Sequence, residues 1–503
     1  MKRTLSVALL LISGSCDALW GYTKVPTLDN NCQVGGVVCK LYEVCSPDTE
    51  QCEQQVPKLT AAKPAIIFSN GDDPVTIAGS GFAPDTQVLI DDQPVTMLMV
   101  NSSQEVAFKT PAKKTAQGWG TTPVKVEVRS GGKSAVRTDL ISWASSVAVF
   151  NPLTISNIVP STNPATIQIG DVDGDGKKDI VARSAANGEF YVTPGNGDGT
   201  FRTSVKSSTG STTSGHFILV DVDQDTKLDL VYWSNSSSTF NYSINPGNGT
   251  FSPQSNMPIS VMLPANYLIG SEDFTGDGKK DLVAVNYSTN SAFSVQAAAN
   301  GKLIAPINQK TITTKDAANR FPLFADFNND KKLDFLLCSD GGGISIFSGN
   351  GAGDFSLSQT YPGSPASYGF AIADFNNDSY PDIAVSNIIS GDIVIFKNLG
   401  GQGFQALSLQ NKATTAVFMF ASDLNGDKNA DIFVFDRNLV SPSGYAFMGH
   451  GDGTFAAPVL SVKSSFPSLI DSRYEDIDGD GKMDAAFINY ADRNAYVIIN
   501  SLK

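Results

Sequence analysis

The chain has 503 residues, of which 41% are hydrophobic, enough apolar material for two to four soluble domains or one large repeat array. Its 50 acidic residues outnumber the 36 basic ones and give a net charge of -14. This charge disfavours nucleic acid or an anionic membrane as a partner unless cations intervene. Bound metal ions could neutralise much of it.

The N-terminus has the pattern of an export signal. Two basic residues lie within positions 1–3, positions 5–12 are largely apolar, and small residues follow before Cys16. We predict a signal peptide over residues 1–15, too short to span a bilayer permanently, and a linker over residues 16–31. No later segment is long and apolar enough to be a transmembrane helix. The protein is therefore expected to be secreted or located at the cell surface.

The sequence Ser-Gly-Ser-Cys at residues 13–16 resembles the lipobox of bacterial lipoproteins, in which the cysteine becomes the acylated first residue. It differs at Ser13, where that motif prefers leucine. Lipidation of Cys16 and plain cleavage nearby both remain open. A lipid anchor at Cys16 is the only membrane attachment that we expect.

Residues 32–52 form a small cysteine-rich segment. Its cysteines are spaced as in two disulfides of an exported protein, with three connectivities open; they are Cys32, Cys39, Cys45 and Cys52. Cys338 lies in the apolar run "DFLLCSD" and is interpreted as a small buried hydrophobic residue.

Residues 57–143 show short alternating apolar runs with turn signals about every ten residues, which predicts a small all-β sandwich. The segment resembles the immunoglobulin-like IPT/TIG domains. A glycine-rich turn closed by an aromatic residue, a Thr-Pro pair and a later glycine pair carry this resemblance, at Gly79, Gly81 and Phe82, Thr110 and Pro111, and Gly131 and Gly132. The resemblance implies a spacer or an interaction module.

An acidic loop recurs seven times from residue 171 onward. Successive copies begin 50, 52, 53, 48, 49 and 53 residues apart, at Asp171, Asp221, Asp273, Asp326, Asp374, Asp423 and Asp476. In each copy one apolar run precedes the loop and two follow it, before a glycine-rich turn that usually ends in an aromatic residue, as in "GNGDGTF". The third repeat departs, with Leu303 in place of the aromatic residue.

Three strands and a turn leading to a fourth make one four-stranded sheet per repeat, and radial repetition of such sheets makes a propeller. The predicted fold class is all-β: a seven-bladed β-propeller over residues 147–503, preceded by the sandwich and the disulfide-rich segment. The last repeat ends at residue 503 without a fourth strand. Residues 149–156 are similar to residues 454–461, with Phe150 in the place of Phe455, so they are expected to close the last blade.

Each loop places oxygen-bearing side chains at positions 1, 3, 5 and 9. The seven sets are Asp171, Asp173, Asp175 and Asp179; Asp221, Asp223, Asp225 and Asp229; Asp273, Thr275, Asp277 and Asp281; Asp326, Asn328, Asp330 and Asp334; Asp374, Asn376, Asp378 and Asp382; Asp423, Asn425, Asp427 and Asp431; and Asp476, Asp478, Asp480 and Asp484. Such crowded carboxylates repel one another without a cation, and a hard ion with about six to eight oxygen ligands fits them. We predict up to seven bound Ca²⁺ ions.

Asp and Asn also favour ordinary turns, but turn preference does not demand the same four positions seven times. No sulfur or imidazole recurs in the loops, which disfavours zinc and copper. Together with the glycine turns, the loops resemble FG-GAP/VCBS repeats, the family of the integrin α-chain propeller and of many exported bacterial proteins. Only three loops keep glycine at position 6, and loops 1 and 7, which combine it with four carboxylates, are expected to bind calcium most tightly.

The predicted function is non-enzymatic: adhesion or ligand binding by the propeller, with an unknown protein or glycan as partner and without nucleic acid. The patterned carboxylates have structural roles, and no catalytic triad occurs at recognisable spacing. His450 is interpreted as a turn residue rather than a base. The alternative is a carbohydrate-active enzyme or a lectin that uses clefts between blades, where Tyr287, Tyr361, Tyr368 and Tyr490 could stack on sugars, although packing is the simpler role for them.

Overall fold

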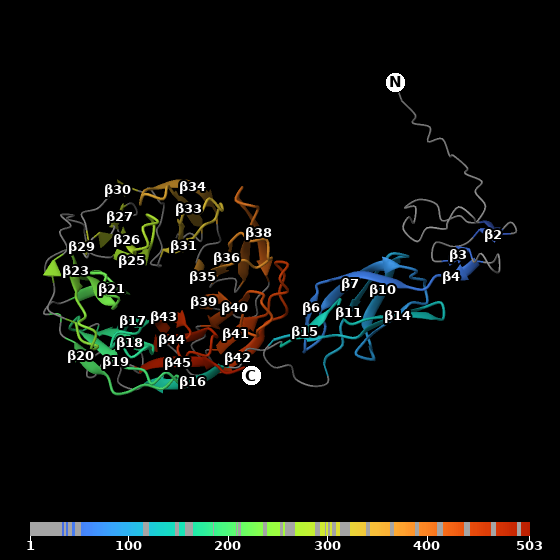
Figure 1. The fold of residues 1–503 in the computed structure, drawn as a ribbon, viewed down its shortest axis with the longest axis horizontal. Helices are drawn as coiled ribbons and strands as arrows, with labels where there is room; N and C mark the ends of the chain where they lie inside the picture. Colours follow the sequence, from blue (N-terminus) through green and yellow to red (C-terminus); the bar gives the residue numbers. More distant parts are fainter. Residues whose placement is uncertain are drawn as a thin grey trace, which may run out of the picture. The chain divides into compact units, whose positions relative to one another are not determined.

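The computed structural model divides the chain into two compact units, Met1–Ser145 and Ser146–Lys503 (Figure 1). The structure describes residues 33–34, 37–38, 43–45, 52–113, 120–145, 150–155, 164–184, 186–207, 209, 213–234, 239–251, 255–256, 267–286, 292–296, 298–299, 302–303, 308–311, 322–338, 343–362, 367–387, 392–409, 416–436, 443–463, 469–489 and 494–502. These residues form strands, turns and bends without a helix, so the all-β prediction is confirmed. Within them, a helix able to cross a membrane is accordingly not found.

Several sequence predictions concern residues outside this description. They are the signal peptide and linker, the possible lipid attachment site, two cysteines and two tyrosines: residues 1–31 with Cys16, Cys32, Cys39, Tyr287 and Tyr490. The backbone alone is described for four further residues that lie in strands: Cys45, Cys52, Cys338 and Tyr368.

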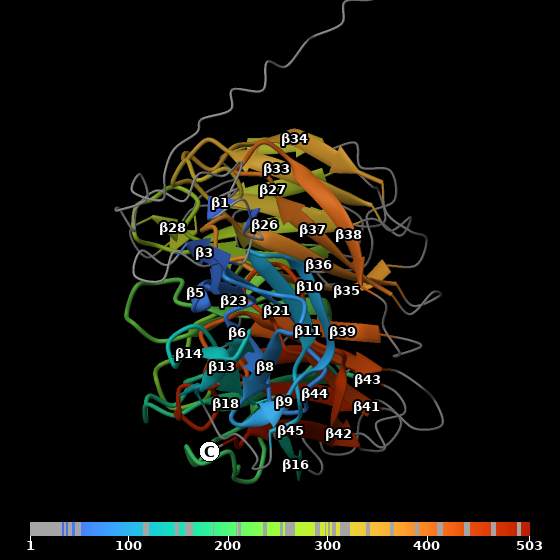
Figure 2. The ribbon, with the colours of Figure 1, turned by 90° about the vertical axis from the view of Figure 1, so that its right-hand side faces the viewer.

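The first unit is a β-sandwich preceded by two short hairpins. Its strands are β1 (Gln33–Val34), β2 (Val37–Val38), β3 (Glu43–Cys45), β4 (Cys52–Gln54), β5 (Lys58–Lys63), β6 (Ile66–Phe68), β7 (Pro74–Ser80), β8 (Gln87–Ile90), β9 (Gln93–Pro94), β10 (Thr96–Ser102), β11 (Glu105–Lys109), β12 (Thr122–Pro123), β13 (Val126–Ser130), β14 (Lys133–Arg137) and β15 (Ser142–Ala144). The strand orders are β10-β11-β7-β5, β14-β13-β8-β9 and β12-β15-β6. Figure 2 shows β10 beside β11 at the edge of the first of these sheets.

Alternation of apolar residues gives the sandwich its core. Val75 and Ile77 of β7 and Val126 and Val128 of β13 are buried in one cluster with Trp143. The indole nitrogen of Trp143 donates to Asp91 Oδ2 at 2.6 Å, so this large side chain is buried with its polar atom bonded.

The hairpin of β3 and β4 bears on the disulfide connectivity. Its antiparallel register places Cys45 opposite Cys52. Opposite residues in antiparallel strands have Cα atoms about 4.5–5.5 Å apart, within the range that a disulfide spans. Of the three connectivities that the sequence leaves open, one joins Cys45 to Cys52 across this hairpin, and peptide mapping without reduction would test it.

The second unit consists of seven four-stranded antiparallel sheets in its described residues, which we number as blades in chain order. The strands are, for blade 1, β17 (Pro164–Gly170), β18 (Asp179–Ser184), β19 (Phe190–Thr193) and β20 (Val205–Ser207); for blade 2, β21 (Thr213–Val220), β22 (Asp229–Ser234), β23 (Thr239–Ser243) and β24 (Ser255–Asn256); for blade 3, β25 (Tyr267–Glu272), β26 (Asp281–Asn286), β27 (Ala292–Gln296) and β30 (Asn308–Thr311); for blade 4, β31 (Leu323–Ala325), β32 (Asp334–Cys338), β33 (Ile344–Gly349) and β34 (Phe355–Tyr361); for blade 5, β35 (Ser367–Ala373), β36 (Asp382–Asn387), β37 (Ile393–Asn398) and β38 (Phe404–Leu409); for blade 6, β39 (Ala416–Ser422), β40 (Asp431–Asp436), β41 (Ser443–Phe447) and β42 (Val459–Lys463); and for blade 7, β43 (Leu469–Glu475), β44 (Asp484–Asn489), β45 (Asn494–Asn500) and β16 (Phe150–Ile155).

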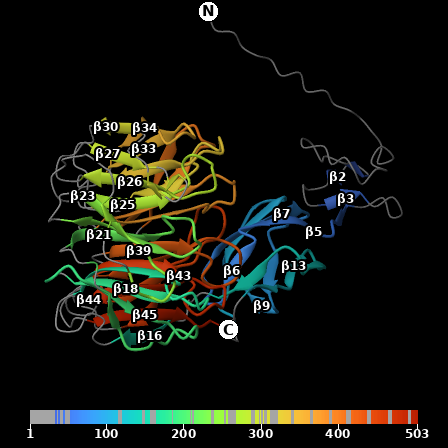
Figure 3. The same cartoon turned by 60° about the vertical axis from the view of Figure 1, so that its left-hand side comes forward.

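The third blade explains the departure that the sequence shows at Leu303. A short hairpin of β28 (Ala298–Ala299) and β29 (Lys302–Leu303) is inserted between β27 and β30. Figure 3 shows β30, β27, β26 and β25 in this order within one sheet. The insertion replaces the glycine turn but keeps the four-stranded order of the blade.

The blades stack face to face and share their cores. The second strand of a blade is buried on both faces, as in β18 and β44, where every residue is buried. Individual apolar clusters each draw on two neighbouring blades: one joins Val283 of blade 3 to Phe335 of blade 4, and another joins Ile180 of blade 1 to Val497 of blade 7. A single blade would therefore expose large apolar faces.

The first and last repeats meet in one sheet. Strand β16 pairs antiparallel with β45, with Phe150 opposite Asn500 and Ile155 opposite Ala495. The first strand of blade 1 also contacts the first strands of blades 2 and 7, so the sheets form a closed ring (Figure 1). Strand β16 is the outermost strand of blade 7, as the similarity of residues 149–156 to residues 454–461 predicts.

Candidate functional site: the acidic loops of the blades

Each acidic loop connects the first and second strands of its blade. Loop 1, for example, runs from Asp171, directly after β17, to Asp179, the first residue of β18. All seven second strands begin at the position-9 aspartate. The chain therefore presents the same short loop at the same end of every blade.

The position-9 carboxylate is fully buried in all seven loops. It accepts the backbone N–H of position 2, as Asp334 does from Phe327 at 3.0 Å. In six loops its other oxygen accepts the N–H of a residue that ends the third strand or lies two residues beyond it; these donors are Gly195, Asn245, Gly349, Asn398, Gly449 and Asn500, at 2.7–2.9 Å. This carboxylate thus joins the loop to the third strand of its own blade.

The position-1 carboxylate shapes the rest of the loop. Its Oδ2 accepts the N–H of position 6 in all seven copies, at 2.7–2.9 Å; the donors are Gly176, Thr226, Gly278, Lys331, Ser379, Lys428 and Gly481. Positions 4 and 6 both have positive φ in every loop. The sequence pattern predicted a left-handed backbone conformation at position 6 only. The second left-handed residue, at position 4, was missed.

Thr226 is the most strained residue of this set, because it is β-branched and has a φ of 71°. Gln224, at position 4 of the same loop, has a φ of 63°. We expect Thr226→Gly to raise the stability of the propeller by about 1 kcal/mol, since glycine removes the left-handed penalty at a small entropic cost. Chemical denaturation of the metal-loaded protein would measure it. Gly176→Thr at the same position of loop 1 is the matched control and should destabilise; equal effects of both changes would contradict the strain.

Comparison with known proteins agrees with this repeated geometry. A family model described as FG-GAP-like repeat matches residues 171–232, 273–337 and 326–385, and one described as IPT/TIG domain matches residues 57–140. The chain carries FG-GAP-like repeats and an IPT/TIG domain. No curated protein matches it.

Solved structures similar to this chain include BBS1N in complex with ARL6DN, at 12% identity and a TM-score of 0.48, covering 70% of this chain and 98% of that one. An auxiliary nutrient binding protein from Bacteroides ovatus is 10% identical with a TM-score of 0.36, covering 89% and 98% of the two chains. One from Bacteroides thetaiotaomicron is 8% identical with a TM-score of 0.39, covering 88% and 98%.

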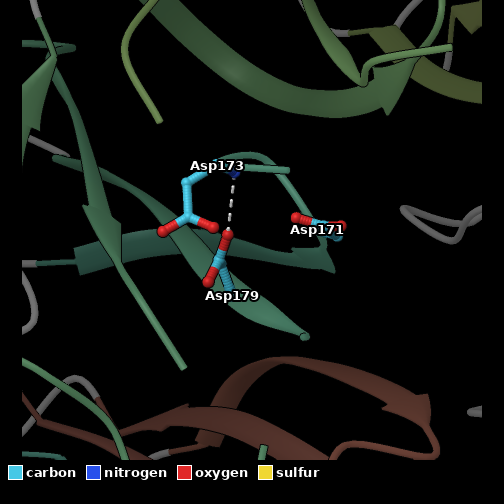
Figure 4. A group of neighbouring side chains, drawn as sticks. All are labelled: Asp171, Asp173 and Asp179. Atoms are coloured by element: carbon cyan, nitrogen blue, oxygen red, sulfur yellow. Dashed lines mark hydrogen bonds between the residues drawn. The ribbon is translucent and has the colours of Figure 1, made fainter. Parts of the chain in front are cut away.

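The acidic loops have a donor set that suits a metal ion. In three loops, three carboxylates each bring one oxygen within 4.8 Å of the others; they are Asp171, Asp173 and Asp179, Asp221, Asp223 and Asp225, and Asp476, Asp478 and Asp484. Figure 4 shows the first group, with the backbone nitrogen of Asp173 bonded to Asp179. Oxygens bound to one ion at about 2.3–2.6 Å lie at most about 5 Å apart. The residues therefore fit a hard divalent cation.

Loop 3 of the FG-GAP-like repeats carries a second sign of such a fit. Asp281 Oδ2 accepts N–H bonds from Phe274 and Thr275, whereas Asp281 Oδ1 is buried and receives no hydrogen bond from the described residues. Because a buried carboxylate oxygen without a partner is costly, a cation beside it would lower the free energy of the folded chain.

Neighbouring blades hold each other's loops. Asn245 of blade 2 donates from Nδ2 to Val172 O, at position 2 of loop 1, at 2.8 Å. Asn398 of blade 5 and Asn500 of blade 7 make the same bond to the preceding loop, to Phe327 O at 2.8 Å and Leu424 O at 3.1 Å. The position-2 side chain itself is apolar and buried in every loop. The loops are therefore part of the interfaces between blades, which their constant apolar position 2 could have indicated.

The other candidate residues lie outside the acidic loops. The Tyr361 hydroxyl donates to Gln359 and accepts the N–H of Phe404 at 2.9 Å, and its ring packs edge-on against Phe396. The backbone N–H of His450 donates to Thr454 O at 3.0 Å within the glycine turn. Tyr361 thus packs blade 4 against blade 5, and the backbone of His450 shapes the glycine turn of blade 6.

Proposed function

We propose that this chain is a secreted or cell-surface calcium-binding protein without catalytic activity, whose propeller binds a protein or glycan ligand. The observation that carries the calcium part is the repeated loop geometry: the same four oxygen-bearing positions recur at the same end of each blade, and in three loops three carboxylates each bring one oxygen within 4.8 Å of the others. When bound, calcium would supply positive charge to carboxylates that crowd together. The residues that would hold it are those at positions 1, 3, 5 and 9 of each loop.

The hydrogen bonds of the loops support a non-catalytic role. The carboxylates at positions 1 and 9 accept backbone N–H groups in every loop, as Asp476 and Asp484 do in loop 7. A general acid or base needs a carboxyl group that is free to exchange its proton with a substrate. These groups are instead held by the backbone that they organise.

The outermost strands support a ligand-binding role. Three successive blades expose a leucine on the fourth strand: Leu357 on β34, Leu407 on β38 and Leu460 on β42, with 51%, 39% and 47% of their surfaces accessible. Exposed apolar surface on an outermost strand is available for contact with another molecule, and contiguous apolar patches mark such contact sites. These three leucines give the proposed binding a surface to test.

The test is a binding screen of the intact protein on a glycan array and on a panel of purified extracellular proteins, with calcium and with chelator. Calcium-dependent binding that is weakened by Leu407→Glu, and unaffected by Gln405→Glu on the same strand, supports the proposal. The same protein is incubated with a set of polysaccharides. Release of shorter sugars from any of them would overturn the non-enzymatic assignment in favour of a carbohydrate-active enzyme.

The proposal also predicts how acidity acts on the loops. Burial raises the pKa of Asp229, Asp334 and Asp382 to about 6 and that of Asp484 to about 7. An unfolded aspartate titrates near 3.9, so the folded metal-free protein binds more protons than the unfolded chain between about pH 4 and 7. Its stability should therefore fall as pH rises through this window.

Calcium and protons compete for these same carboxylates, so the calcium-loaded protein should show the opposite trend. We expect the gap in melting temperature between calcium-loaded and chelated protein to narrow steadily from pH 8 to pH 5. Thermal denaturation at each pH, with a chelator matched for its own pH dependence, measures this gap. A gap that stays constant would mean that the buried aspartates do not bind the ion.

A further inference from the structure

Blade 1 holds a cation of its own beside its acidic loop. The guanidinium of Arg202 places Nη2 2.9 Å from Asp173 Oδ2 and 3.5 Å from Asp175 Oδ2. Nη2 also lies 3.5 Å from the backbone oxygen of Gly195. Arg202 therefore contacts two of the four side chains that would hold calcium in loop 1.

The oxygens that Arg202 contacts are the ones that the loop backbone leaves open. Asp173 Oδ1 accepts the N–H of Asp175 at 3.2 Å, and Asp175 Oδ1 accepts the N–H of Lys177 at 3.0 Å. Both Oδ2 atoms face the guanidinium instead. A guanidinium and a divalent cation would thus draw on the same two carboxylates.

The sequence places an arginine at this position in one repeat of the seven. Arg202 directly follows the aromatic residue that ends the glycine turn, and the corresponding residues of the other repeats carry no positive charge; they are Asn151, Ser252, Ile304, Ser356, Gln405 and Ala456. In loops 1, 2 and 7 the lysine two residues after position 5 pairs with the position-5 carboxylate, as Lys177 does with Asp175 Oδ2 at 3.5 Å, so Arg202 is an additional cation in loop 1. Arg202 reaches loop 1 from a separate segment of the blade.

We propose that Arg202 is a built-in counter-cation that stands in for calcium at loop 1, so that blade 1 stays ordered without the ion and binds it more weakly than loop 7 does. This inference rests on the proposed calcium binding. It reverses part of the sequence expectation, which placed loops 1 and 7 together as the tightest sites. Blade 1 contacts blade 7 where the ring closes, so a metal-independent loop there would let the ring close before the other loops are filled.

Two variants that each remove one positive charge distinguish a specific role of Arg202 at loop 1 from a general effect of charge. Arg202→Ala removes the counter-cation. Lys206→Ala, on β20 of the same blade, removes a cation that pairs with Glu189; the side chains of Arg202 and Lys206 are both 49% exposed. Arg202→Lys keeps the charge without the planar guanidinium.

Calcium affinity is measured by competition with a chromophoric chelator. We expect Arg202→Ala to strengthen binding at one site about ten-fold, equivalent to about 1.4 kcal/mol, because a cation next to a divalent ion repels it. Lys206→Ala should change no site. In an Asp171→Asn background, which weakens loop 1 itself, the gain from Arg202→Ala should disappear.

Stability without calcium provides a second readout. In chelator, Arg202→Ala should melt below the unsubstituted protein, since Lys177 beside Asp175 is then the one cation left to offset the repulsion between Asp173 and Asp175 among the described residues, whereas Arg202→Lys and Lys206→Ala should melt close to it. If the unsubstituted protein binds calcium and Arg202→Ala matches Lys206→Ala in both readouts, the role of Arg202 is wrong and the proposed function stands. If the unsubstituted protein binds no calcium, the proposed function fails and this inference with it.

Discussion

Removal of calcium by excess chelator should lower the melting temperature of the propeller by about 10 °C or more. Each loop saturated at about 100 times its dissociation constant adds about 2.7 kcal/mol to the folded state, because the ion binds the folded loop and not the unfolded chain. Several such loops together are comparable with the whole stability of a typical domain, about 5–15 kcal/mol. Calorimetry of the intact protein before and after chelation measures the shift.

The first unit serves as an internal control for this experiment. Its residues 57–143 contain no acidic loop of the repeated pattern, so a transition that belongs to the sandwich should keep its temperature in chelator. Added Mg²⁺ should restore less stability than added Ca²⁺, because Mg²⁺ requires shorter bonds and a stricter octahedral geometry. A propeller transition that does not move after elemental analysis confirms removal of the ion would contradict the role of calcium in the fold.

The repeat period and the apolar runs were sufficient to predict the strands of each blade. The acidic loop begins after the first strand and ends at the first residue of the second, as in β36, which starts at Asp382. The reason is local: charged and glycine-rich residues cannot continue a strand that is buried on both faces, so the pattern marks the boundary. Strand and loop boundaries that depend on neighbouring residues could therefore be predicted from the sequence.

The partners of the position-9 aspartate could not be predicted in this way. Asp382 accepts the N–H of Asn398, 16 residues later, and this pairing depends on the register of the second and third strands. The bond from Asn398 to Phe327 O crosses to the preceding blade over 71 residues. Sequence spacing alone cannot show which backbone donors meet one carboxylate when they come from different strands and blades.

These contacts give the acidic loops a second structural role, because they also join neighbouring blades. A loop that only bound a metal would affect its own blade, whereas these loops also accept bonds from the blade that follows. Position 2 is buried between blades, and its carbonyl receives the asparagine of the next repeat in three places. Filling one loop with an ion should therefore stiffen two blades, so loss of calcium should unfold the ring cooperatively rather than blade by blade.

Asp484→Ala in blade 7 should cost roughly 2–6 kcal/mol, because it leaves two buried backbone donors without an acceptor. Asp484 accepts the N–H of Ile477 and the N–H of Asn500, both at 2.8 Å. Asn500 lies in β45, the strand that pairs with β16 to close the ring, and its side chain bonds Leu424 O of blade 6. Urea denaturation of the calcium-loaded protein measures the loss.

Asp198→Ala is the matched control, since Asp198 is an exposed aspartate that accepts the N–H of Thr200 in a glycine turn. It should cost well under the loss at Asp484. Asp484→Asn gives a second test, because a change in packing alone would cost the same stability with calcium and with chelator. It keeps the shape of the side chain and removes its charge, so it should destabilise the protein in calcium but cost much less in chelator, where the buried charge of Asp484 is itself unfavourable at pH 8. An equal cost of Asp484→Asn in both conditions would mean that this carboxylate serves the backbone alone and holds no ion.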